Sequence, residues 1–205
     1  MERRVRPRLD VLVAGGGSAA FARDLRRLGA TAAILGAGWA ASGDLVPARH
    51  LHVASAFPQP GSRLQELFRA AKEAGLSTSF DPQWEPGEAG ELDLQSILPV
   101  VDVFLSTEAG ILALTGEAGL PEALDALVSY ARILVVRLAD RGFMARFDGK
   151  SLQVPPFPSP PGADSGHEGY GATFLFRFLQ GAPVEECLAF ANQMASSTLP
   201  ISPRV

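Results

Sequence analysis

The 205 residues, 47% of them hydrophobic and 20% charged, are enough for one globular domain with a large core, so residues 1–205 are expected to form a single domain. A net charge of −4 gives no basic field for nucleic acid or for an anionic membrane, and neither partner is expected. A lone cysteine, Cys187, excludes an internal disulfide framework, and no apolar run of about 18 residues indicates a membrane segment, so a soluble cytoplasmic protein is expected.

The first elements in the chain are typical of a βαβ unit. Leu9 to Ala14 predicts a buried strand, the turn Gly15-Gly16-Gly17 follows, and apolar residues at helical spacing predict a helix that stops at Gly29. Thr31 to Leu35 predicts the next strand. The glycines do not match the dinucleotide-binding fingerprint, and no acidic residue ends the second strand, so the sequence argues against a Rossmann NAD site.

The middle of the chain continues the alternation of strands and helices. Strands are predicted at residues 51–54, 77–80, 101–105 and 133–138, and helices from Pro60, Leu92, Thr107 and Pro121. His50 and His52 flank the start of the first of these strands and are expected to face solvent or to cap. Asp81 and Trp84 follow the second, in a proline-rich loop of the kind that lines ligand crevices.

The last third begins with a hairpin of residues 142–147 and 151–154, turned by Asp148-Gly149. Phe174 to Leu179 is apolar all round and is expected to be buried. Pro183 begins the final helix, with Cys187 on its inner face. Together these elements predict an α/β fold with three layers, α/β/α, around a mostly parallel sheet.

A parallel sheet brings the carboxyl ends of its strands to one edge, where ligands of such folds bind. The loops expected at this edge are those at Gly15, Asp81, Ser106, Ala139 and Asp164.

The glycine-rich loop at residues 162–171 is the strongest candidate site in the sequence. Asp164 or Ser165 can cap the helix that follows, and its free backbone N–H groups favour an anion. Glu168 is expected in the first helical turn, where a carboxylate can take a proton from an attacking hydroxyl. The plainer interpretation, a capped helix with turn glycines, stays open.

Several segments in this order are similar to one known family. They are Gly15-Gly16, Ala70–Leu76 leading to Phe80–Trp84, Glu108 to Gly116, Arg137–Gly142 and Phe190–Asn192. From about Gly15 to its end, the chain resembles the ribokinase-like, or PfkB-type, carbohydrate kinases. The resemblance implies a ribokinase-like fold with a small β lid, and ATP and Mg²⁺ as cofactors. It also implies transfer of a phosphoryl group to the hydroxyl of a sugar or nucleoside.

The resemblance places the family's anion hole on Ser165-Gly166-His167 and its catalytic carboxylate on Glu168. A second alignment sets Gly169-Tyr170-Gly171-Ala172 on the motif, with Ala172 at the position of the base. The first is favoured. The resemblance also implies nucleotide contacts at Asp81, Thr107, Glu108, Ala139, Gly142 and Asn192. The substrate side falls on Gly15, Gly16 and Asp164, and no metal-ligand cluster is predicted.

Two departures from the family argue for a degenerate member. The family's Asn-x-x-Glu, which organises Mg²⁺ and phosphates, falls on Thr107 and Gly110, so its carboxylate is gone. The lid has only a short connection between Leu35 and Leu51 in its place, and is expected to be missing or vestigial. Its loss is expected to expose an edge strand near Leu51, which a homodimer would cover.

Three functions follow as hypotheses. The first is a weak or inactive relative that retains a nucleotide- or phosphate-binding site. The second is an active ATP-dependent phosphotransferase with Glu168 as its base. The third is a scaffold protein that binds no ligand.

Overall fold

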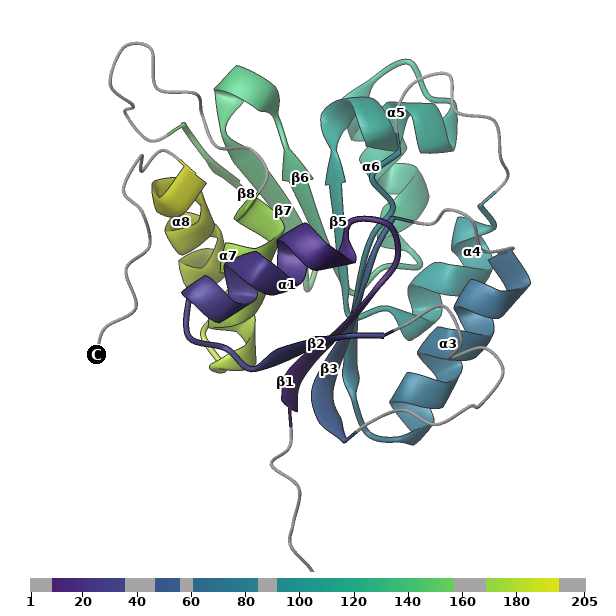
Figure 1. Cartoon of the computed structure of the whole chain (residues 1–205). Coiled ribbons are helices and arrows are strands. Elements are labelled where there is room, and N and C mark those ends of the chain that lie inside the picture. The colour runs from purple at the N-terminus through teal and green to yellow at the C-terminus, as the bar shows by residue number, and fades with distance from the viewer. Residues whose placement is uncertain (1–8, 36–46, 56–60, 85–91, 157–168, 196–205) are drawn as a thin grey trace, which may run out of the picture.

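The central element of the structure is an eight-stranded sheet (Figure 1). The computed structural model describes residues 9–35, 47–55, 61–84, 92–156 and 169–195. The strands lie in the order β2-β1-β3-β4-β5-β6-β7-β8. Their bounds are β1 (Leu9–Ala14), β2 (Ala32–Ile34), β3 (Ala48–Ala54), β4 (Ser77–Asp81), β5 (Val103–Thr107), β6 (Ile133–Arg137), β7 (Phe143–Phe147) and β8 (Lys150–Val154). Pairing is parallel from β2 to β6 and antiparallel for β7 and β8.

Helices cover both faces of the sheet (Figure 1). One face carries α1 (Ser18–Arg27), α7 (Tyr170–Leu179) and α8 (Val184–Ala195). The other carries α3 (Gly61–Glu73), α4 (Leu94–Ile97), α5 (Glu108–Thr115) and α6 (Leu120–Val128), and two short 3₁₀ turns are η1 (Leu98–Val100) and η2 (Ala139–Arg141). The predicted α/β/α fold with a mostly parallel sheet is confirmed. No helix within the described ranges is both long and apolar enough to span a membrane.

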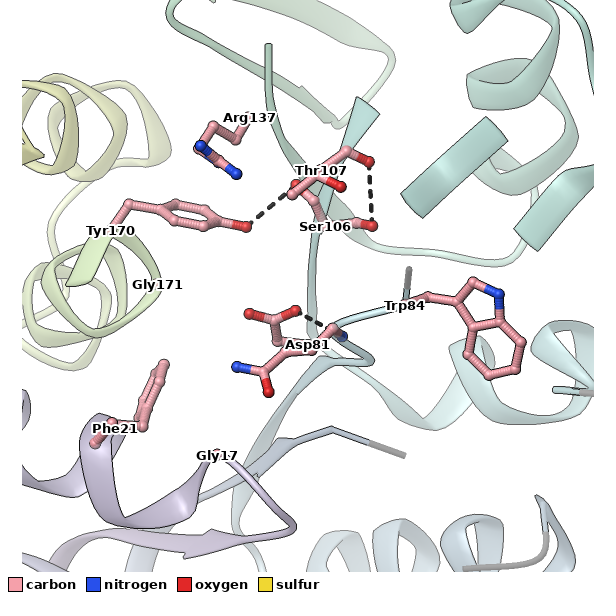
Figure 2. Close-up of a pocket in the computed structure, with 11 residues that line it drawn as sticks. Gly17, Phe21, Asp81, Trp84, Ser106, Thr107, Arg137, Tyr170 and Gly171 are labelled. Atoms are coloured by element: carbon pink, nitrogen blue, oxygen red, sulfur yellow. Dashed lines mark hydrogen bonds between the residues drawn. The ribbon is translucent and has the colours of Figure 1, made fainter. Parts of the chain in front are cut away.

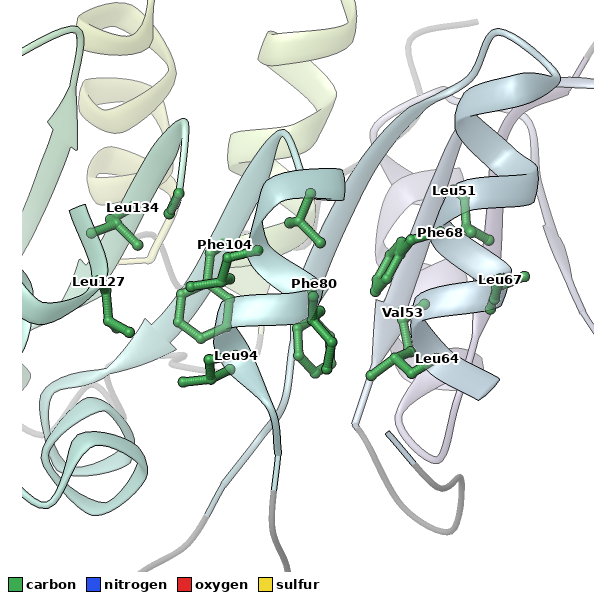
Figure 3. Packing of buried hydrophobic residues seen from close by; sticks show 14 of the residues in the cluster. Leu51, Val53, Leu64, Leu67, Phe68, Phe80, Leu94, Phe104, Leu127 and Leu134 are labelled. Carbon is green, nitrogen blue, oxygen red and sulfur yellow. The ribbon is translucent and has the colours of Figure 1, made fainter. Parts of the chain in front are cut away.

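Each face of the sheet has its own apolar core. Under α3, Phe80 of β4 lies between Phe68 and Phe104, with ring centroids 5.8 Å from each (Figure 3). Under α7 and α8, the core includes Phe174 and Cys187, both fully buried. Burial raises the pKa of the Cys187 thiol to about 11, so this cysteine is an uncharged core residue, as predicted.

Local sequence signals explain where several elements begin and end. Asp148 and Gly149 both have positive φ angles, of 47° and 70°, and make the tight turn between β7 and β8 that this pair predicts. The expected burial of Phe174 to Leu179 is only half right, because the chain from Phe176 onward is partly exposed. Arg177 lies in that half, and its guanidinium reaches Glu186 of α8 at 3.3 Å in solvent.

His50 and His52 are fully buried, so the expectation that they face solvent or cap the strand is wrong. Strand β3 begins at Ala48, earlier than predicted, so both histidines belong to the strand and are buried there. Hydroxyl groups of β4 pair with three of their four ring nitrogens: Ser77 Oγ lies 2.7 Å from His50 Nδ1, and Ser79 Oγ lies 2.7 Å from His50 Nε2 and 2.8 Å from His52 Nδ1. His52 Nε2 is buried and has no hydrogen-bond partner among the described residues. The ring of His52 also stacks on Phe21 of α1, with centroids 3.7 Å apart.

Acid is expected to destabilise the fold through His50. Burial lowers the pKa of His50 from 6.5 to about 3, so below pH 6.5 the unfolded chain binds a proton that the folded chain does not. The stability that this residue contributes is therefore complete above pH 6.5 and is lost as the pH falls towards 3. Between pH 7 and pH 5 the free energy of unfolding should fall by about 2 kcal/mol from His50 alone.

Urea unfolding of the wild type and of a His50 variant at the two pH values isolates this loss, because Asp81 acts in the opposite direction in both proteins. The variant His50→Asn keeps a polar side chain without a titrating ring, so its free energy of unfolding should depend less on pH. An equal dependence on pH in the variant and the wild type would contradict the assignment to His50.

The edge predicted near Leu51 does not exist in the sheet. Strand β3 is paired on both sides, with β1 and with β4, and Leu51 is fully buried. The prediction failed because β1, an earlier element, inserts between β2 and β3. The predicted lid connection includes residues 36–46, which lie outside the described residues.

Candidate active site

A pocket of about 500 Å³ lies at the carboxyl edge of the parallel strands (Figure 2). Its walls come from the start of α1, the ends of β4, β5 and β6, and the start of α7. The residues that line it are Gly17, Ala20, Phe21, Asp81, Gln83, Trp84, Ser106, Thr107, Arg137, Tyr170 and Gly171. This is the edge at which the sequence predicts a ligand site.

The order of the strands opens the pocket. After β1 the chain crosses one face of the sheet through α1, whereas after β3 it crosses the other face through α3, so the two connections diverge beside each other. Gly171 allows α7 to close the pocket from the α1 face. A Cβ atom at this position would lie 3.1 Å from Phe21 and 3.2 Å from Leu105, so a larger residue would push α7 outward.

Tyr170, the first residue of α7, contacts the sheet through its hydroxyl group and its ring. Its hydroxyl donates a hydrogen bond of 3.1 Å to the carbonyl oxygen of Ser106, and its ring packs on Phe143 with centroids 5.3 Å apart. Burial raises the pKa of Tyr170 well above its ordinary value, and the nearby charge of Asp81 acts in the same direction. The phenol is therefore an uncharged donor that closes one wall of the pocket (Figure 2).

Asp81 is the acidic side chain of the pocket wall. Its Oδ1 accepts a hydrogen bond of 3.1 Å from the backbone N–H of Gln83. Burial raises the pKa of Asp81 to about 6, although that hydrogen bond and the charge of Arg137 both act to lower it. The carboxyl group of Asp81 therefore passes from its neutral to its charged form as the pH rises through about 6.

Replacing Asp81 with asparagine is expected to stabilise the fold. Asp81 ionises near 3.8 when unfolded and near 6 when folded, so its contribution to stability is complete below pH 3.8 and is lost as the pH rises through 6. Asp81→Asn removes the buried charge and should raise the free energy of unfolding by about 1–2 kcal/mol at pH 7.5, with little gain near pH 4.

Urea unfolding at both pH values checks this gain, with Asp93→Asn as the control. Asp93 is exposed and caps α4 by accepting from Ser96 N. Hydrogen bonds from the hydroxyl and then from the backbone N–H of Ser96 lower the pKa of Asp93, so its substitution should give no gain at pH 7.5. A stability of Asp81→Asn that equals the wild type at pH 7.5 would sink the prediction.

Arg137 supplies the positive charge of the pocket. It is the last residue of β6, and Figure 2 shows its guanidinium beside Tyr170, toward the open space of the pocket. Its Nε is buried and has no hydrogen-bond partner among the described residues, and within those ranges no carboxylate forms an ion pair with it. A guanidinium placed in this way is suited to bind an anion.

Thr107 and Glu108, two of the predicted nucleotide contacts, have different surroundings. Thr107 lines the pocket and caps α5, because its Oγ1 accepts a hydrogen bond of 2.9 Å from Gly110 N. The carboxylate of Glu108 is held by the guanidinium of Arg141 in an ion pair. The Glu108 side chain does not line the pocket.

Five other predicted contacts are not among the residues that line the pocket. Asn192 is buried and donates to the carbonyl of Pro155 at 2.8 Å. Ala139 has a φ angle of 50°. Gly142 has a φ angle of 86°, and a Cβ there would lie 2.1 Å from Val154 O. Gly15 and Gly16 form the turn just before Gly17, the first residue of the wall.

The loop that sequence reasoning favoured lies mostly outside the described residues. This is so for Asp164, Ser165, Gly166, His167 and Glu168, and their predicted roles stay predictions. The described part of helix α7 begins at Tyr170, after Gly169. Its first described turn contains Ala172, which is fully buried.

Arg137 and Tyr170 are the functional candidates that the sequence did not single out. Arg137 ends the β-branched strand 133–137, and a charged residue in that position reaches the ligand edge of a parallel sheet, so this signal was present. Tyr170 stands between two glycines and carried no such signal. Its place in the wall depends on the packing of α7 against β5.

Together, the parallel sheet and its edge pocket define an α/β protein with a ligand site at the carboxyl ends of its strands. The profile of the pfkB family carbohydrate kinases matches residues 39–199. The chain belongs to this family, and the resemblance read from its sequence is confirmed.

The curated relatives are kinases of small molecules. The chain is 32% identical over 141 residues to a 2-dehydro-3-deoxygalactonokinase of Haloferax volcanii, covering 64% of this chain and 44% of the relative. It is 23% identical over 148 residues to a cytidine kinase of Thermococcus kodakarensis, a match that covers 69% of this chain and 53% of the relative. The chain thus spans about half the length of the curated relatives it matches.

Solved structures confirm the ribokinase-like fold. An Arabidopsis thaliana ribokinase complexed with ribose and ATP has a TM-score of 0.73 at 15% identity, over 95% of both chains. A putative ribokinase II of E. coli in complex with ATP and Mg²⁺ has a TM-score of 0.70 at 13% identity, over 96% of this chain and 94% of that one. At these identities the likeness is one of fold.

Proposed function

We propose that this chain is a PfkB-family protein that retains a phosphate- or nucleotide-binding pocket and has weak or no phosphotransferase activity. The observation that carries the proposal is Arg137, a guanidinium in the wall of a 500 Å³ pocket at the ligand edge of the sheet, with which no carboxylate of the described residues forms an ion pair. A phosphate oxygen is the kind of acceptor that such a donor binds.

The start of α7 adds to this attraction. Tyr170 and Gly171 are in its first turn and line the same pocket as Arg137. The backbone N–H groups of a first turn have no partner inside the helix, and the helix dipole favours an anion there. Both features act on a ligand in one pocket, which supports a bound phosphate group.

Weak turnover is proposed because the described pocket lacks the carboxylates of an efficient kinase. Asp81 is the acidic group on its described wall. In the second alignment the base position is Ala172, whose methyl group cannot accept a proton. Transfer through Glu168, the first alignment, is the competing proposal, and the kinase relatives favour it.

Isothermal titration with ATP, ADP and inorganic phosphate tests the binding site, and thermal unfolding gives a second readout. A ligand at 100 times its Kd should add about 2.7 kcal/mol of stability. Absence of binding for all three ligands would refute the proposal and favour the scaffold hypothesis.

Turnover of ATP over a panel of sugars and nucleosides separates the other two hypotheses. The expected result is slow or absent turnover, unchanged in Glu168→Gln. Fast turnover that Glu168→Gln removes would establish an active kinase with that residue as its base.

A further inference from the structure

The described wall of the pocket has few carboxylates that could bind a metal ion. Within the described residues the pocket wall has one acid, Asp81, and one base, Arg137. Burial raises the pKa of Asp81 to about 6, so part of its population is neutral even close to pH 7. The Arg137 guanidinium, in contrast, stays charged at every pH at which a protein folds.

Another described acid near this edge, Glu108, is engaged elsewhere. Glu108 begins α5, directly after the pocket residue Thr107, and its carboxylate is bound by the guanidinium of Arg141. A cation at Glu108 would have to displace Arg141. The ion pair therefore competes with any metal for this carboxylate.

Mg²⁺ is held in phosphoryl-transfer sites by one or two carboxylates together with the phosphates of the substrate. The family's Asn-x-x-Glu, which organises this ion, falls here on Thr107 and Gly110. The Thr107 hydroxyl already accepts from Gly110 N at 2.9 Å, and Gly110 has no side chain. No cluster of three or more potential metal ligands occurs in the part of the chain that the structure describes. The donor set of the described residues therefore does not fit Mg²⁺.

Among the described residues that line the pocket with Asp81, the other charged side chain is that of Arg137. From α1 the pocket receives Gly17, Ala20 and Phe21, which are uncharged, and from β5 it receives hydroxyl groups. Asp24 of α1 pairs with Arg23 at 3.2 Å and with Arg27 at 3.6 Å. On β3, burial holds the pKa of His52 well below its ordinary value, so this ring is neutral.

We propose that the pocket binds the phosphate groups of a nucleotide without a divalent cation, with the Arg137 guanidinium supplying the positive charge that Mg²⁺ supplies elsewhere. The inference rests on the proposed function, and it adds that the nucleotide binds in its metal-free form. A free nucleotide keeps its full negative charge for Arg137, whereas Mg²⁺ neutralises part of that charge and finds no described carboxylate pair to bind. The preferred ligand is then the metal-free nucleotide.

The test is calorimetric titration of the full chain with ATP and with ADP, in buffer with EDTA and in buffer with millimolar Mg²⁺. The Kd in EDTA should equal the Kd in Mg²⁺ or be several-fold lower. Tightening by Mg²⁺ of about tenfold or more, which is about 1.4 kcal/mol, would overturn the inference while leaving the proposed function intact. Absence of binding in both buffers would refute the inference and the proposed function together.

The variant Asp81→Asn gives a second, independent readout. If Asp81 only repels the ligand, its replacement should tighten nucleotide binding several-fold in EDTA and in Mg²⁺ alike. If Asp81 instead held a metal, the variant would bind more weakly, and only in the buffer that contains Mg²⁺. That second pattern would overturn the inference.

Discussion

Replacing Arg137 with methionine is expected to weaken the binding of ATP, ADP and inorganic phosphate by about 10- to 100-fold, because a hydrogen bond to a charged group contributes about 1.5–3 kcal/mol. Methionine keeps much of the apolar stem, so the wall of the pocket should stay closed. Calorimetric titration at pH 7 measures the change in Kd. Arg137→Lys should retain part of the affinity, since it keeps the charge but loses the planar fork of donors.

The matched control for this experiment is Arg146→Met. Arg146 lies on the neighbouring strand β7 and also has a buried Nε without a described partner, but its guanidinium pairs with Asp125 at 2.8 Å and does not line the pocket. This variant should bind the ligands as the wild type does. Equal losses in the two variants would show that Arg137 acts through general charge or stability rather than through contact.

Replacing Gly15 with alanine is expected to cost at least about 3 kcal/mol of stability. Gly15 has a φ angle of 97°, where residues with a Cβ are strained, and the added Cβ would lie 2.0 Å from the carbonyl oxygen of Ala54. The turn after β1 would have to move away from β3. Because this turn leads into α1, the pocket should lose its shape with the fold, and urea unfolding measures the loss.

Gly16→Ala is the adjacent control. A Cβ at Gly16 meets its nearest neighbours, atoms of Ser55, at 3.6 Å or more, which is ordinary contact. Its stability should stay within about 0.5 kcal/mol of the wild type. The resemblance places substrate contacts on both glycines, and Gly16→Ala tests such a contact without disturbing the fold. Similar stability losses for both variants would contradict the steric argument.

The fold was predictable because its signals are local and repeated. Strand β1 has the predicted bounds, and the Asp148-Gly149 turn forces the β7–β8 hairpin. The position of β3 was less predictable, since its first residues pair with β1 and the ring of His50 forms hydrogen bonds with serines of β4, both distant in sequence. Periodicity assigns a polar ring to solvent, whereas the sheet supplies it with buried hydroxyl partners.

The candidate site was predictable in place and only partly in composition. Reasoning from strand ends brought Asp81 and Ser106 to the edge where the pocket lies, because parallel strands finish together. It named Arg137 only as the first residue of the family segment Arg137–Gly142 and not as a site residue. It also gave most weight to residues 162–168, which the structure does not describe. The two alignments of this loop place the catalytic base either on Glu168 or on Ala172. Local spacing in the sequence does not decide between them.

The buried histidines of β3 and the pocket carboxylate give this protein two opposing responses to acid. Protonation of Asp81 near pH 6 relieves a buried charge and favours the folded state, whereas the same pH range begins to favour the unfolded state through His50. Acidification towards pH 6 therefore makes the pocket more positive at little net change in stability. Below pH 6 Asp81 continues to offset His50 until the carboxyl group of the unfolded chain is protonated too, near pH 3.8, whereas His52, whose pKa burial also lowers, adds to the loss of stability. Ligand affinity and fold stability should thus have different optimal pH values, with the tightest anion binding on the acidic side of the most stable state.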